Sequence, residues 1–252
     1  MNLSVDVFAD ARADLVFNMG APYTRLEPGH VESIRHSNVD AQRVHPITIK
    51  QRGEVIVAGV RFKTAGLGAF VASVHRFTNR VVPLATVFGR DIVAFERTIR
   101  EKIGDAKSQG ALLDDYFGSR LDATDSKKEL WALKSKIEAA HGLVRIDELC
   151  DEAGISIRQV DRLFREHLGI RPKTFARIAR FQNAIGLLKK DPGCTMADVA
   201  VRCGYYDQSH FVHDFRRFAG AAPKDKRGYF PASAPSDFSP NVVQFLQDSP
   251  PK

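Results

Sequence analysis

The segment "GYYDQSHFVHDFRRFAG", residues 204 to 220, combines an aromatic pattern typical of a buried helix face with polar groups that its own fold does not require. Phe211, Phe215 and Phe218 recur at helical spacing. The hydrogen-bonding side chains between them are Gln208, Ser209, His210 and His213. The two histidines form an HxxH pair, but no third metal ligand lies nearby in the sequence, so we expect no metal site. The polar groups are therefore expected to act on a partner that itself forms hydrogen bonds.

The same arrangement occurs twice in the second half of the chain. Residues 146–172 and 196–223 each predict an amphipathic helix, a short turn and a second helix. Gly154 and Gly204 stand where a tight turn needs a positive φ. A glycine followed three residues later by a proline ends each second helix, as Gly169 with Pro172 and as Gly220 with Pro223. This is the pattern of the helix-turn-helix motif, whose second helix enters the major groove of DNA.

The two predicted recognition helices present side chains suited to base edges and phosphates. In the first helix, the residues expected to point inward are Val160, Leu163, Phe164 and Leu168. Arg158, Arg162 and Arg165 then share an outward stripe, with Asp161 beside it. In the second helix, the outward residues are Tyr206, His210, His213 and Arg217, flanked by Gln208 and Ser209. Arg pairs with guanine and Gln with adenine, whereas Ser and His contact bases or phosphates.

A long helix is predicted between the two units, over residues 173–190. Its continuous apolar stripe consists of Phe175, Ile178, Phe181, Ile185 and Leu188. Asp207 is the predicted N-cap of the second recognition helix. A rigid connector of this kind would hold the two recognition helices about one turn of B-DNA apart, roughly 34 Å.

The positive charge of the chain lies entirely in this region. Residues 127–231 contain 20 Lys and Arg against 13 Asp and Glu, whereas the remainder contains 17 of each. Because no basic helix has a wide apolar face, we expect the partner to be double-stranded DNA and not a membrane. The three cysteines lack CxxC spacing, which argues against a disulfide framework or a zinc site. We expect a cytoplasmic protein without a cofactor.

The first half of the chain predicts a different class of fold. Short β-rich runs at 14–18 and 54–62 and helical patterns over 89–107 and around 112–117 indicate an α+β domain at 1–118. It is followed by a polar linker at 119–129, an all-α domain with two helix-turn-helix motifs at 130–230, and a partly disordered tail, rich in Pro and Ser, at 231–252.

Residues 128–230 resemble the DNA-binding domain of the AraC/XylS family of bacterial transcription regulators, above all in "GYYDQSHFVHDFRRFAGAAP". The resemblance implies two helix-turn-helix units joined by a linker helix. It also implies base contacts from Arg158, Asp161 and Arg162 in the first unit and from Gln208, Ser209 and His213 in the second. His213 stands where the family often has Arg, which predicts a contact that depends on pH.

Residues 5–118 are similar to the sensor-like domain of many AraC-type regulators, in "ADLVFNMG", "GVRFKTAG" and "NRVVPLATVFG". Those relatives usually have further β-strand residues before "DLVF", so we expect a sensor-like domain that is short at its N-terminal end. The resemblance makes a small-molecule effector, a homodimer and an RNA polymerase contact candidate partners.

Two enzyme-like alternatives remain open at the level of sequence. One is a DNA alkylation-repair protein, which needs a reactive cysteine with metal-type neighbours outside the helix-turn-helix units. Cys150, Cys194 and Cys203 all lie within the basic region, which disfavours it. The other is an enzyme or binding protein for a small molecule that uses its DNA-binding module for autoregulation. The scattered histidines of residues 1–118 have no catalytic spacing, so we expect no enzyme.

Overall fold

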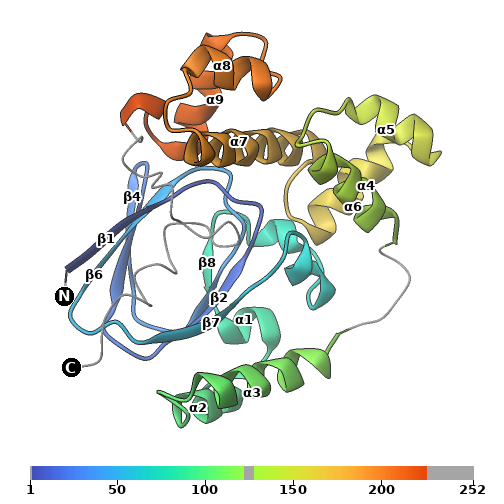
Figure 1. Cartoon of the computed structure of the whole chain (residues 1–252). Coiled ribbons are helices and arrows are strands. Elements are labelled where there is room, and N and C mark those ends of the chain that lie inside the picture. Colours follow the sequence, from blue (N-terminus) through green and yellow to red (C-terminus); the bar gives the residue numbers. More distant parts are fainter. Residues whose placement is uncertain (1, 122–127, 226–252) are drawn as a thin grey trace.

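The computed structural model of the chain describes residues 2–121 and 128–225. An N-terminal part made largely of β-strands is followed by a helical C-terminal part, and a long helix, α7 (Pro172–Lys190), lies across one end of the sheets (Figure 1). The predicted tail at 231–252 and much of the predicted linker lie outside the described residues. The α+β class of the first part and the all-α class of the second are confirmed.

The N-terminal part contains two four-stranded antiparallel sheets. The first sheet has the order β1 (Asn2–Val7), β6 (Ile47–Arg52), β3 (Tyr23–Glu27) and β4 (His30–Ile34). The second has the order β7 (Val57–Arg61), β2 (Asp14–Asn18), β5 (Asn38–Asp40) and β8 (Val81–Pro83). The strand predicted at 14–18 is confirmed, and the one predicted at 54–62 is shorter. The pairing of β1 with β6 was not predicted.

Strand β2 shows how the alternating pattern builds the second sheet. Leu15 and Phe17 are buried, while their neighbours on the strand, Asp14 and Val16, are less so. The strand pairs with β5 on one side and β7 on the other, so it lies in the middle of the sheet. Its buried face packs against three helices: α1 (Leu84–Phe88), α2 (Asp91–Arg100) and α3 (Ala106–Gly118).

The helix predicted over 89–107 is wrong in its extent. Helix α2 ends at Arg100, and Ile103, expected on its apolar face, is 47% exposed. Gly104 adopts a φ of +88°, which a continuing helix does not permit. Asp105 then caps α3, because its carboxylate accepts a hydrogen bond from the Ser108 amide at 3.0 Å. A glycine and a capping aspartate in succession therefore divide the pattern into two helices.

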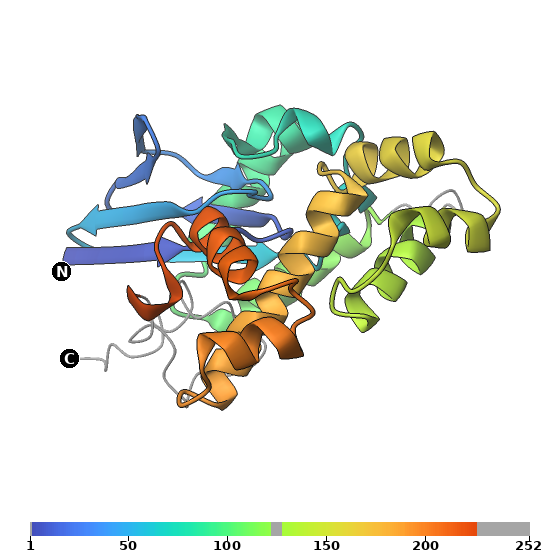
Figure 2. The same ribbon diagram turned by 90° about the horizontal axis from the view of Figure 1, so that it is seen from above.

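Helices of the C-terminal part surround α7. They are α4 (Lys128–Ala139), α5 (Ile146–Ala153), α6 (Ile157–His167), α8 (Met196–Arg202) and α9 (Gln208–Ala219). Seen from above, α7 runs between α4–α6 on one side and α8–α9 on the other (Figure 2). All five residues of its predicted apolar stripe are buried. No helix in the described ranges is long and apolar enough to cross a membrane.

Candidate nucleic-acid interface

The first helix-turn-helix unit consists of α5, a turn at Gly154 and α6. Gly154 has a φ of +66°, as the turn prediction required. Ser156 and Gln159 form a reciprocal capping box, in which the Gln159 amide donates to Ser156 Oγ and the Ser156 amide donates to Gln159 Oε1. Val160, Phe164 and Leu168 are buried, as predicted for the inward face, whereas Leu163 is only partly buried.

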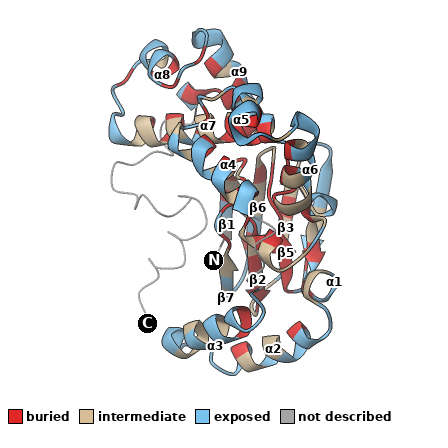
Figure 3. Ribbon diagram, turned by 90° about the vertical axis from the view of Figure 1, so that its right-hand side faces the viewer, coloured by how far each residue is buried: buried red, intermediate tan, exposed pale blue. Residues whose placement is uncertain are grey.

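The outer face of α6 carries the predicted basic stripe. Arg158, Arg162 and Arg165 are all exposed, and none of them forms an ion pair with another described residue. Asp161 is less available, because its Oδ1 lies 3.8 Å from Nε of Arg171 and its side chain is 33% exposed. The three guanidinium groups are therefore free to bind an external acceptor. Figure 3 colours the exposed residues of α4–α6 pale blue.

The second unit consists of α8, a turn at Gly204 and α9. Thr195 and Asp198 form a capping box on α8. Asp207 is the N-cap of α9, as predicted, and its Oδ1 accepts a hydrogen bond from the His210 amide at 2.7 Å. The inward phenylalanines, Phe211, Phe215 and Phe218, are all fully buried. The second unit therefore has capped helices, and buried aromatic residues hold its second helix, as the sequence predicts.

The outer face of α9 carries the predicted polar set. The exposed members are Gln208, Ser209, His210, His213 and Arg217. His210 is partly engaged, since its ring meets that of the buried Tyr205 edge to face at 5.4 Å. Tyr206, next to the N-cap, is 92% exposed. The N-terminal end of α9 thus offers an amide, a hydroxyl and a phenol beside the positive end of the helix dipole.

One further residue at the surface of the first unit was not predicted. Ile157, the first residue of α6, is 58% exposed although its type is typical of a core. It lies beside Arg158, at the end of the helix that a recognition helix inserts into the groove. Its exposure could have been predicted from its position directly after the Ser156 N-cap, because the first three side chains of this helix are exposed.

An ion pair with a buried carboxylate holds the second recognition helix on α7. Asp214 is 1% exposed and accepts hydrogen bonds from Nε and Nη2 of Arg177. This pairing raises the pKa of Arg177. Phe181 of α7 packs its ring against both Phe215 and Phe218, with centroids 5.4 Å apart in each case. The rotation of α9 about its axis is therefore fixed by charge and by packing together.

The alternative chemistries have little geometric support. Among the described residues, no group of three or more His, Cys, Asp or Glu side chains could hold a metal ion. All three cysteines are buried, and burial raises the pKa of Cys150 and of Cys203. A raised thiol pKa disfavours the thiolate that an alkyl-accepting cysteine requires.

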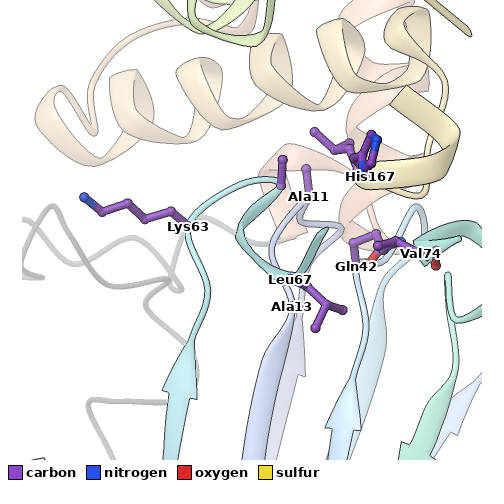
Figure 4. Close-up of a pocket in the computed structure, with 9 residues that line it drawn as sticks. Ala11, Ala13, Gln42, Lys63, Leu67, Val74 and His167 are labelled. Carbon is purple, nitrogen blue, oxygen red and sulfur yellow. Dashed lines mark hydrogen bonds between the residues drawn. The ribbon is translucent and has the colours of Figure 1, made fainter. Parts of the chain in front are cut away.

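A small cavity lies where the N-terminal part meets the end of α6. Gln42, Val74 and His167 line it, whereas the side chain of Lys63 points away from them (Figure 4). Its volume is about 10 Å³, room for about one water molecule. In this conformation the cavity does not accommodate an effector.

Comparison with known families agrees with this geometry. Residues 149–228 match the family described as "Helix-turn-helix domain". Over 84 residues the chain is 31% identical to the HTH-type transcriptional activator RhaS of Escherichia coli (strain K12 / DH10B). The chain carries an AraC-type helix-turn-helix domain. This match covers 33% of the chain and 30% of RhaS, so it does not extend over the whole of either protein.

Solved structures extend the likeness in fold to most of the chain. ToxT from Vibrio cholerae superposes with a TM-score of 0.51 and 8% identity, covering 90% of this chain and 97% of ToxT. ToxT from Vibrio cholerae O395 bound to (E)-4-(8-methylnaphthalen-1-yl)but-3-enoic acid gives a TM-score of 0.50 and 10% identity, covering 90% and 98%. The sheet-rich part followed by the AraC-type domain is therefore a known combination of folds.

Proposed function

We propose that this protein is a sequence-specific DNA-binding transcription regulator that reads two successive major-groove segments with α6 and α9. One observation carries the proposal. Both second helices of the repeat are held by buried aromatic residues on one face, while the opposite face presents unpaired basic and amide groups. A solvated surface needs no such duplication, whereas two successive grooves on one side of B-DNA require it.

The base contacts are assigned to exposed residues among the first six positions of each helix. On α6 they are Arg158 and Arg162, with Asp161 as a weaker candidate because of its contact with Arg171. On α9 they are Gln208, Ser209 and His213. The methyl groups of Ile157 are suited to the C5-methyl of thymine.

Phosphate contacts are assigned to the residues farther along each helix. Arg165 on α6 and Arg217 on α9 lie in the last turns, where a recognition helix leaves the groove. His210, in the first turn of α9, is assigned to the phosphate contacts as well, because its side chain is exposed. These contacts set affinity and its salt dependence and carry no sequence information.

The division between the two units can be tested with one variant in each. Arg158→Ala should relax selection in one half of the preferred site, and Gln208→Ala should relax it in the other half. Binding of both variants is measured against single-base substitutions across the site. If both variants relax the same half, or if neither alters the base preference, the assignment of α6 and α9 to separate groove segments is wrong.

We infer that residues 1–118 sense a small-molecule effector or form a homodimer, with 119–129 as linker and 130–230 as the DNA-binding domain. The fold likeness to a ToxT structure that holds a small organic acid supports a search for effectors of that class. The test is thermal melting of the full chain with a panel of small carboxylic acids, followed by DNA binding with any compound that raises Tm. A panel without any stabilising compound would count against acids as effectors.

A further inference from the structure

The C-terminal ends of both recognition helices contact the N-terminal part of the chain. At the end of α6, Oγ1 of Thr78 donates a hydrogen bond to the carbonyl of Gly169 at 2.8 Å, and Nε2 of Gln42 donates to Thr78 Oγ1 at 2.8 Å. The backbones also approach closely, since a Cβ on Gly68 would lie 2.2 Å from the carbonyl oxygen of His167. Residues of the first half of the chain therefore hold the C-terminal end of α6 in place.

The end of α9 has a corresponding anchor. The amide of Ala9 donates to the carbonyl of Phe218 at 2.8 Å, which satisfies a group that the helix itself leaves unpaired. The carbonyl of Ala9 in turn accepts a hydrogen bond from Nε2 of Gln182 on α7 at 3.0 Å. Pro46 lies close to Gly220, directly after α9, since a Cβ on Gly220 would be 3.1 Å from Cγ of Pro46.

The two anchors belong to one hydrogen-bonded surface, here called the ledge and defined as residues 8–10, 42–46 and 78–79. Asp10 and Arg43 exchange two backbone hydrogen bonds, of 3.1 and 2.9 Å, which join the α9 anchor to the residue after Gln42. The amide of Asn79 donates to the Gln42 carbonyl at 3.0 Å, and the amide of Val44 donates to Asn79 Oδ1 at 2.8 Å. Each anchor is thus tied to the other without passing through α7.

A buried ion pair between Arg43 and Asp40 stabilises the backbone of the ledge. Arg43 is 2% exposed, and its Nη1 lies 2.7 Å from Oδ2 of the buried Asp40. Displacing this backbone would leave a buried charge without its partner, which is strongly unfavourable.

The two recognition helices are connected through α7 and, separately, through the ledge. Gly169, between α6 and α7, has a φ of +80° and no side chain, so the first unit joins α7 through a glycine turn. A second connection closes a loop from α6 through the ledge to α9. We propose that the ledge sets the relative position of the two recognition helices, and that Gln42 and Thr78 are positioning residues for the spacing of the DNA half-sites. This inference rests on the proposed function, because it concerns how two DNA-reading helices are held.

The proposal is tested with Thr78→Val in the full chain, which removes the hydroxyl and keeps the shape. Each protein is titrated against three duplexes: the preferred two-part site, the same site with one base pair inserted between its halves, and a single half-site. One inserted base pair rotates one half by about a tenth of a turn relative to the other. Thr78→Val should lower the preference for the original spacing by about three- to tenfold, the effect of one lost hydrogen bond. Its affinity for the single half-site should stay unchanged.

Two matched variants separate positioning from general destabilisation. Thr78→Ser keeps the hydroxyl and should retain the spacing preference. Thr48→Val, which removes the bond from Thr48 Oγ1 to Asp6 Oδ1 on the first sheet, should behave as the wild type. If Thr78→Val melts before binding can be measured, Gln42→Leu tests the same link from its other end.

Unchanged spacing preference in a folded Thr78→Val protein would overturn the proposal. Equal weakening on all three duplexes would also overturn it, because a merely structural role predicts that result. Failure of the proposed function is distinguishable from both outcomes, since the wild type would then show no preferred two-part site.

Discussion

Asp214 of α9 and Arg177 of α7 form an ion pair in which the carboxylate is 1% exposed and the guanidinium is 30% exposed. Asp214→Asn keeps the shape of the side chain but leaves the Arg177 charge without its partner. Because Arg177 is partly solvated, we expect a loss of about 1–3 kcal/mol in the free energy of unfolding, below the cost of breaking a fully buried pair. Chemical denaturation measures it. Asp151→Asn, on the exposed surface of α5, is the control, and an equal loss in both variants would contradict the role of the pair.

Phe215→Ala should act through stability and not through recognition. Phe215 is fully buried and packs against Phe181 and Phe211, so its removal leaves a cavity in the core. We expect a loss of about 3–5 kcal/mol in the free energy of unfolding. Val201→Ala, at a site that is 78% exposed on α8, should change it by less than about 0.5 kcal/mol. An equally stable Phe215→Ala protein with an altered base preference would show that the faces of α9 are assigned wrongly.

Arg162→Ala should weaken binding to the preferred site by about 1–3 kcal/mol and relax selection at one base position. The reason is that Arg162 is exposed on α6 and has no ion-pair partner among the described residues, so its guanidinium is free to contact a guanine edge. Competition against single-base variants of the site measures the change. Weakening that is equal on every sequence would make Arg162 a phosphate contact.

Arg165→Ala and Arg217→Ala serve as the contrast to Arg162→Ala. Each should weaken binding to all sequences alike and reduce the dependence of log K on log salt by about one phosphate contact. Titrations at several salt concentrations give this slope. A slope that does not change would remove the residue concerned from the phosphate contacts.

Asp10→Asn should increase stability near neutral pH. The residue as a whole is only partly buried, but burial of its carboxyl raises the pKa of Asp10 above the ordinary 3.8, despite the nearby Arg12 and Arg43. The folded chain therefore holds this proton at pH values where the unfolded chain has released it. The resulting stability is complete below pH 3.8 and is lost as pH rises through the raised value. The variant should lack this decline, as measured by Tm across pH, and an identical decline in both proteins would contradict the expectation.

Local chemistry made much of the C-terminal part predictable. The turns at Gly154 and Gly204, the cap at Asp207 and the buried phenylalanines each depend on residues within one or two helical turns, where sequence spacing maps directly onto a face. The N-terminal part was less predictable because its sheets join distant strands, as in the pairing of β1 with β6. Such pairing leaves little signal in a short stretch of sequence.

Contacts between distant residues are also what the sequence could not reveal about the site. Asp214 looks like one more polar residue on α9 until α7 brings Arg177 to it. Thr78 and Gly169 are 91 residues apart, and nothing in either segment predicts their hydrogen bond. The buried core of the helical part likewise includes Phe8, Ala9, Ala11 and Ala65 of the first half. The charge distribution separates a basic C-terminal half from a balanced N-terminal half, but it gives no sign that the two halves share a core.

The most direct test of the central claim is selection of bound sequences from a random duplex library by the full chain. Two helices that read successive groove segments predict an enriched site with two separated half-sites, with centres about 10 to 10.5 base pairs apart. Repeating the selection with Arg162→Ala should erase the preference at one position of one half-site and leave the other half-site intact. A pool with no shared sequence, or with one short contiguous site and no second half, would contradict the account.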